Sequence, residues 1–344
     1  MLYVVLFFTF FSLFLYVLLG GADFGAGIVE LFSSRENKKL NRDTVYKIMG
    51  PVWEANHIWL IILIVILWIA FPGYFNIIII YLHIPLTLVL LGITMRGVAF
   101  IFRHYDAVID KSQDWYNRMF RFSSLITPIF LGMSFGALVS GEIVVTNDYS
   151  ETTFAEIFMD PWLNIFTFLT GLFYASLCAF LASTLLIGET SGDIRKMYSR
   201  KSAIFTIVLV IIGGMVLFYG YYTEMTFVKE FLQNTISLSA IALSALLLIP
   251  LWRAIKKQHR LLTRIYAGLQ ILLVIFAAVH THFPNLIITR NSEVDMLAGI
   301  APESVINVLG ISLIIGGGII LPGLFHLMKS FNMIRLPSRS SNEE

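Results

Sequence analysis

The sequence is poor in cysteine and in charge, and each shortage excludes a class of protein. Its single cysteine, Cys178, cannot form a disulfide framework or a cysteine metal site. Charged residues make up 13% of the 344 residues and hydrophobic residues 57%, whereas an average soluble domain has about 25% charged residues. A formal net charge of +2 gives no basis for binding nucleic acid. Walker, dinucleotide-binding and HExxH motifs of soluble enzymes are absent. Composition therefore favours an integral membrane protein.

Long apolar runs are what the chain has in place of charge. A helix needs about 20 residues to cross a hydrocarbon core of about 30 Å. We predict nine such spans, at residues 2–32, 50–71, 74–103, 122–145, 161–188, 202–222, 228–252, 264–286 and 303–330. The sequence thus predicts an all-α integral membrane protein with a multi-pass domain at 1–336 and a disordered tail at 337–344.

The basic residues predict how these spans are oriented. Lys and Arg gather in cytoplasmic loops, and alternation of nine spans places every Lys and Arg except Lys229 and Arg290 on one side. We therefore expect an outer N-terminus and a cytoplasmic C-terminus. The acidic outer segment 142–160 is expected to be a solvated loop. For the inner segment 104–121 we expect either a helix at the membrane interface or an ordinary charged loop.

Two carboxyl groups stand in strongly apolar surroundings. Asp23 comes late in the first span and Glu54 early in the second, so both are expected at similar depth in the cytoplasmic third. Acidic residues inside transmembrane helices usually face the bundle interior and mark ion or proton paths. The alternative is a structural role, in which each carboxylate caps backbone or pairs with an arginine of an inner loop.

The neighbours of both acids are unusual for a membrane helix. Gly21 and Gly25 have the small-xxx-small spacing that lets another helix approach Asp23 closely. Around Glu54, the first turns of the second span carry Trp53, Asn56 and His57. Such a dense polar patch is a more specific sign of a functional site than any one of its residues alone.

One arginine and seven histidines complete the candidate residues. Arg96 lies in the third span at the depth of both acids, so it either extends to the inner interface or pairs with Asp23 or Glu54. The histidines are scattered, and His280 and His282 point in different directions on one helix. We expect single hydrogen-bonded histidines, with no haem or other metal bound in this chain.

Together these residues resemble subunit II of the cytochrome bd family of quinol oxidases. The matching segments are residues 21–27, residues 50–61, Phe71 with Pro72, and residues 96–100 with Arg103. The match is dense over the first 105 residues, and beyond them length and helix number agree. Glu54 stands where some members have aspartate. The carboxyl group is kept, but glutamate carries it on a longer side chain.

The resemblance implies a nine-helix subunit built as two four-helix bundles and a peripheral helix. It implies a bacterial or archaeal cell membrane and a larger partner, subunit I, with haem b and haem d (or a further haem b), acting on quinol and oxygen. Small accessory subunits, membrane lipids and a structural quinone accompany some members, and that quinone is assigned to no residue here. The resemblance also implies a cytoplasmic proton path through Asp23 and Glu54. Trp53, Asn56, His57 and Arg96 would support it.

Two other functions stay open at this stage. A proton- or cation-coupled secondary transporter also places acids inside helices, but the sequence has none of the inverted repeats or paired glycine-broken helices that would favour it. A structural membrane scaffold is the second alternative. A scaffold role predicts that each of the two carboxyl groups can be replaced on its own.

Overall fold

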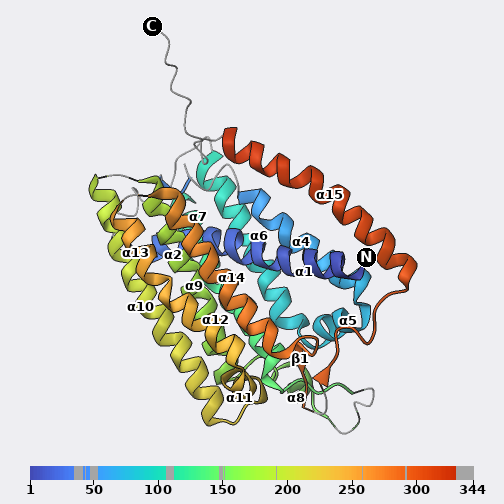
Figure 1. Ribbon diagram of the computed structural model, residues 1–344. Helices are drawn as coiled ribbons and strands as arrows, with labels where there is room; N and C mark the ends of the chain where they lie inside the picture. The colour runs from blue at the N-terminus through green and yellow to red at the C-terminus, as the bar shows by residue number, and fades with distance from the viewer. Residues whose placement is uncertain are drawn as a thin grey trace.

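The chain is built almost entirely of helices, which confirms the all-α class (Figure 1). The computed structural model describes residues 1–34, 42, 44–46, 53–105, 112–146, 150, 152–190, 192–257, 259–290 and 293–330, without the side chains of 53–55, 104, 105, 189, 260, 327, 328 and 330. The tail expected to be disordered, 337–344, lies outside these ranges. The larger helices are α1 (Leu2–Leu15), α2 (Gly21–Leu31), α4 (Trp53–Ala70), α6 (His83–Tyr105), α7 (Ser112–Ser140), α9 (Ile165–Glu189), α10 (Gly192–Tyr222), α12 (Thr235–Leu246), α14 (Arg260–His282) and α15 (Glu303–Ser330).

Shorter elements join them. They are the π-helix η1 (Tyr16–Gly20), the helices α5 (Pro72–Tyr81), α8 (Phe154–Phe158), α11 (Thr226–Gln233) and α13 (Leu248–Lys256), and the strands β1 (Ile287–Ile288) and β2 (Glu293–Val294). The two strands pair antiparallel, with Ile287 opposite Val294. Short helices and a two-residue ladder of this kind satisfy backbone groups where the chain turns between spans.

Eight helices of the described ranges are long and apolar enough to cross a membrane, and a bent pair, Asn56–Ala70 with Pro72–Tyr81, makes up to nine. The pair bends by 118°. The span predicted at 74–103 is present, but it is shorter than predicted and covers His83–Arg103. The first residues of the predicted span form α5, and the following membrane helix begins at His83. Pro72 is the first residue of α5. Proline has no N–H to extend the hydrogen bonding of α4, but it suits the start of a new helix.

The first span is one helix with an irregular middle. The segments α1, η1 and α2 follow one another without a break from Leu2 to Leu31. A π-helix holds more residues per turn than an α-helix and therefore rotates the following side chains. Beyond it, every residue of α2 from Gly21 to Glu30 is buried. The carboxyl-terminal half of the first span is thus surrounded by the rest of the protein.

Helix α2 packs against α7 and α9, and α10 packs on α9. The contact between α2 and α9 is closest at Gly25, where an added Cβ would lie 1.8 Å from the backbone oxygen of Cys178. At Gly21 the nearest atom to such a Cβ is Leu181 Cδ1, at 3.3 Å. The close helix approach predicted from the glycine spacing is therefore present, and its tightest point is Gly25.

Helix α15 lies at the edge of the molecule, packed against α1 and α4, while α12 and α14 pack together on the other side (Figure 1). This arrangement is compatible with a peripheral helix. The grouping of the remaining helices into two four-helix bundles stays a prediction.

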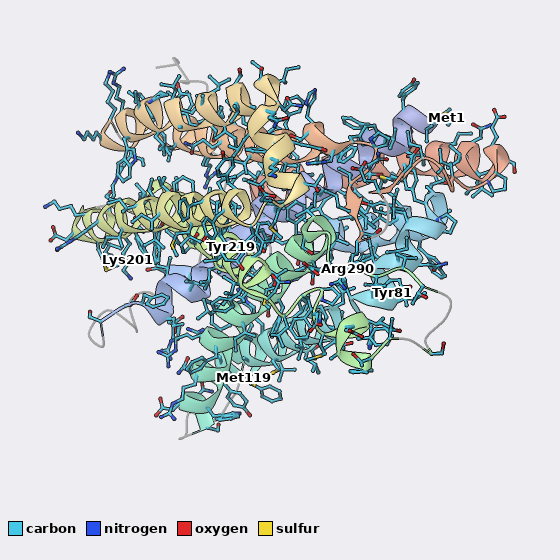
Figure 2. The ribbon with its side chains drawn as sticks, turned by 90° about the horizontal axis from the view of Figure 1, so that it is seen from below. Met1, Tyr81, Met119, Lys201, Tyr219 and Arg290 are labelled. Carbon is cyan, nitrogen blue, oxygen red and sulfur yellow. The ribbon has the colours of Figure 1, made fainter. Side chains whose placement is uncertain are left out.

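The two ends of the molecule carry different charges. At one end, here called the basic end, three basic side chains donate hydrogen bonds. Arg103 donates to the Glu30 carboxylate, Lys201 to the backbone oxygen of Val29, and Arg195 to the backbone oxygen of Ile255. Met1, Tyr81 and Arg290 lie toward the other side of Figure 2, away from Lys201. That the basic end faces the cytoplasm stays a prediction.

Two connecting segments differ from expectation. Residues 112–121 are helical, but they do not form a separate helix, because α7 begins at Ser112 and continues to Ser140. That this part of α7 lies at the membrane interface stays a prediction. Its first turns carry charge since they extend past the apolar part of the span. The segment 142–160 is also not simply solvated. It contains α8, buries Ile143 and Ile157, and joins the turn after α14 through a bridge from Ile143 to Thr289.

Candidate functional site

Asp23 is buried in the centre of the molecule. It lies in the first turn of α2, and 2% of its surface is exposed. The small residues Gly21, Ala22 and Gly25 nearby let α7 and α9 approach α2 closely and enclose the carboxyl group. A buried carboxylate in such a place is stable only when it is paired and hydrogen-bonded.

Arg96 of α6 provides that pairing. Its Nη1 lies 2.5 Å from Asp23 Oδ2, and its Nη2 donates to Oδ1 at 3.0 Å and to the backbone oxygen of Asp23 at 2.7 Å. The remaining donor, Nε, reaches Ser124 Oγ on α7 at 2.9 Å. Of the two positions expected for Arg96, the structure shows the ion pair with Asp23. Two of these four hydrogen bonds reach the carboxylate oxygens, and this bidentate contact fixes the orientation of the carboxylate.

The first turns of α4 lie against the same carboxylate. His57 Nε2 is 3.9 Å from Asp23 Oδ2, and Asn56 is buried. The side chains of Trp53 and Glu54, which begin α4, lie outside the part that the structure describes. The contact of His57 brings the Glu54 end of α4 toward Asp23, but a position for the Glu54 carboxyl group stays a prediction.

A second buried ion pair, which the sequence reasoning missed, lies nearer the basic end. Arg103 Nη2 donates to Glu30 Oε2 at 2.6 Å, and both side chains are 1–2% exposed. Glu30 follows Asp23 by seven residues, and Arg103 follows Arg96 by seven. Because seven residues are two helical turns, both acids share one face of α2 and both arginines one face of α6. This shared spacing was the available signal, and the position of Glu30 near a helix end concealed it.

Phe120 of α7 links the two pairs. Its ring lies 4.7 Å from the guanidinium carbon of Arg96 and 4.4 Å from that of Arg103. The negative face of an aromatic ring attracts cations, and more strongly where water is excluded. Phe120 therefore separates the two guanidinium groups while stabilising both.

Lys201 of α10 ends this row of polar groups. Its ammonium donates to the backbone oxygen of Val29 at 3.1 Å and to Ser33 Oγ. Val29 is in the last turn of α2, whose backbone oxygens carry partial negative charge, and Ser33 follows that helix. Asp23, Glu30 and Ser33 thus place polar groups at intervals along the first span toward the basic end.

The chain as a whole matches a known family model. The model of the cytochrome bd terminal oxidase subunit II aligns with residues 1–331. The chain belongs to this family. It is 30% identical over 213 residues to the cytochrome bd ubiquinol oxidase subunit 2 of Bacillus subtilis, which is 60% of this chain and 59% of that protein. A putative cytochrome bd menaquinol oxidase subunit II of the same organism is 23% identical over 92% of both chains.

A solved structure has the same fold. The bd oxidase from Geobacillus thermodenitrificans contains a chain that superposes with a TM-score of 0.74 at 17% identity, over 96% of this chain and 99% of that one. The predicted resemblance to subunit II is therefore confirmed over the length of the chain and not only over its first 105 residues.

His282 and His83 lie within hydrogen-bonding distance of nearby groups. Both ring nitrogens of His282 face acceptors, Glu230 Oε2 at 3.1 Å and the backbone oxygen of Phe227 at 3.2 Å. His83 Nδ1 lies 2.8 Å from the backbone oxygen of Ile80. Within the described residues no three His, Cys, Asp or Glu side chains converge to hold a metal ion. The haem that the family implies is assigned to the partner subunit under the proposed function.

Proposed function

We propose that this chain is the haem-free subunit II of a cytochrome bd-type quinol:oxygen oxidoreductase. It would form a heterodimer with a larger subunit I that holds haem b and haem d or a further haem b. The observation that carries the proposal is the match of the family model to residues 1–331. Family membership also makes a secondary transporter the weaker reading of the buried acids. The cell membrane of a bacterium is the location that the bacterial relatives support.

Within that complex, we assign to this chain a path for protons from the cytoplasm. Formation of water from oxygen consumes protons, while quinol oxidation in the partner releases its protons on the outer side. If the consumed protons enter from the cytoplasm, charge is separated across the membrane without a pump. The buried row of polar groups on α2 supports this assignment, since it leads from the basic end to Asp23.

Glu54 and Asp23 are the proposed relay. The Arg96 guanidinium makes three hydrogen bonds to Asp23, two of them to its carboxylate oxygens. In the proposed relay, Asp23 would receive a proton and pass it on. Glu54 would deliver that proton, with Asn56, His57 and Trp53 shaping the approach. The distance of 3.9 Å between His57 and Asp23 supports a short transfer between the two helices.

The experiment has two steps. First, the tagged chain is purified from its native membrane, and a reduced-minus-oxidised spectrum is recorded with quinol-dependent oxygen uptake. A larger haem-bearing partner is expected, and a haem-free chain without a partner would overturn the proposal. Second, Asp23→Asn and Glu54→Gln are compared with Asp193→Asn, an exposed acid. The first two are expected to lower oxygen uptake at least about tenfold with haem retained. The control is expected to keep full turnover.

The second step also separates a relay from a structural role. Full turnover in both buried variants would remove the relay assignment. Loss of haem together with turnover would show that the acids maintain the assembly instead.

A further inference from the structure

A buried row of hydroxyl groups continues along the first span on the other side of Asp23. The buried residues of α1 are Val5, Thr9 and Ser12, and Tyr16 follows on η1 with 3% of its surface exposed. Thr9, Ser12 and Tyr16 are three and four residues apart, so they lie on one face of the helix. An apolar helix that buries hydroxyl groups at three consecutive turns needs a reason for doing so.

Two of these hydroxyl groups lack a hydrogen-bond partner in the part of the chain that the structure describes. Thr9 donates to the backbone oxygen of Val5 at 2.8 Å. Ser12 Oγ and Tyr16 Oη are fully buried and have no such partner. Burying a hydroxyl group without a hydrogen-bond partner is unfavourable. Proteins commonly satisfy such groups with buried water, so both side chains indicate water inside the helix bundle.

Tyr16 lies beside the candidate site. Its ring lies over Gly20, where an added Cβ would be 3.0 Å from Tyr16 Cε2. The ring centroids of Tyr16 and His57 are 6.4 Å apart, and His57 Nε2 in turn lies 3.9 Å from Asp23 Oδ2. His57 therefore connects the Tyr16 ring with the Asp23 carboxylate.

The π-helix itself creates this arrangement. Its wider turn sets Tyr16 above Gly20, a residue without a side chain, and leaves room for the aromatic ring. A π-helix is less stable than an α-helix and occurs frequently at functional sites. The irregular turn and the unpaired hydroxyl thus fall on the same residue.

We infer that Tyr16 is the next proton-carrying group after Asp23 and that Ser12 continues the route through buried water. The inference rests on the proposed function and extends it by two residues. The Tyr16 hydroxyl would accept a proton from water on the Asp23 side as it donates its own to water on the Ser12 side. The phenol keeps its charge and its oxidation state, so the transfer needs no co-reactant.

The test uses the whole complex with Tyr16→Phe and Ser12→Ala. Both changes remove a hydroxyl group and keep the shape of the side chain. Tyr74→Phe is the matched control, because Tyr74 is also a buried tyrosine but lies on α5. Quinol-driven oxygen uptake is measured in H₂O and in D₂O, together with haem content. Tyr16→Phe is expected to lower uptake about two- to tenfold, the effect of one hydrogen bond on a rate. Its solvent isotope effect is expected to rise, with haem content unchanged.

The outcomes separate this inference from the proposed function. If Asp23→Asn and Glu54→Gln lower uptake but Tyr16→Phe keeps full rate and isotope effect, the inference is wrong and the relay stands. If all of these variants keep full turnover, the proton path itself is wrong. Loss of haem in Tyr16→Phe with an unchanged isotope effect would also overturn the inference, in favour of a structural role. An experimental structure of the complex should show water hydrogen-bonded to Tyr16 Oη, and a dry site would contradict the proposal.

Discussion

Gly25 offers the sharpest test of how Asp23 is held in place. The change is Gly25→Ala, and the new methyl group would lie 1.8 Å from the backbone oxygen of Cys178 and 2.4 Å from its carbonyl carbon. Real Cβ atoms essentially never come within 3.0 Å of a neighbouring heavy atom. The distance of 1.8 Å to the Cys178 oxygen is therefore 1.2 Å too short. Backbone cannot rotate aside as a flexible side chain can, so α2 and α9 must move apart. Overpacking in a core costs about 1–3 kcal/mol, and this contact should reach the upper limit.

The displacement should also affect Asp23, two residues before Gly25. Its hydrogen bonds to Arg96 are 2.5–3.0 Å long, so a shift of about 1 Å takes them out of the range of good geometry. We therefore expect a lower apparent midpoint of thermal inactivation and a smaller yield of intact complex. Gly21→Ala is the control. Its methyl group would meet the end of the flexible Leu181 side chain at 3.3 Å, and the expected cost is below about 1 kcal/mol.

The assay is the fraction of complex that remains assembled in size-exclusion chromatography after heating at a fixed rate. Fixed heating matters because unfolding of a large membrane complex is governed by rates. Equal midpoints for the two glycine variants would refute the close approach of α2 and α9.

Two further predictions concern the ion pairs. In a double-mutant cycle of Asp23→Asn and Arg96→Gln, each single change should destabilise the complex by about 3–5 kcal/mol because it leaves a buried charge unpaired. The destabilisation of the double variant should be about 2 kcal/mol smaller than the sum of the two single destabilisations. Strictly additive effects on thermal inactivation would contradict the pairing. Likewise, Glu30→Gln should destabilise by about 3–5 kcal/mol because it strands Arg103. Loss of the exposed Asp193–Lys196 pair in Asp193→Asn should cost below about 1 kcal/mol. Equal midpoints for those two variants would show that Glu30 and Arg103 are not buried together.

Much of the fold follows from hydropathy, and its errors have local causes. The spans are long apolar runs, which few other structures explain. The break between α5 and α6 was missed because Tyr81, Leu82 and His83 contain neither proline nor glycine. The start of α7 at Ser112 was missed since its first turns are charged. In both places tertiary packing decides where the helix ends, and local sequence does not report it.

The candidate site was predictable in its types of residue but not in its pairing. The sequence singles out Asp23 and Arg96 as charges inside apolar spans. Whether Arg96 turns to the interface or to Asp23 depends on how α6 is rotated against α2, which no local pattern encodes. Glu30 was overlooked because depth was judged from sequence position alone. Its burial arises from α7 and α10, which cover the end of α2.

The two ion pairs also constrain how the chain is assembled in the bilayer. The acids are in the first span and the arginines in a later one, so synthesis delivers Asp23 and Glu30 before Arg96 and Arg103 exist. A carboxylate exposed to lipid at mid-membrane costs up to about 2.5–3.5 kcal/mol. The nascent first helix is therefore unsatisfied until α6 arrives. A slip of one helical turn between the two helices would break both pairs at once. The double pairing can thus act as a register check during biogenesis.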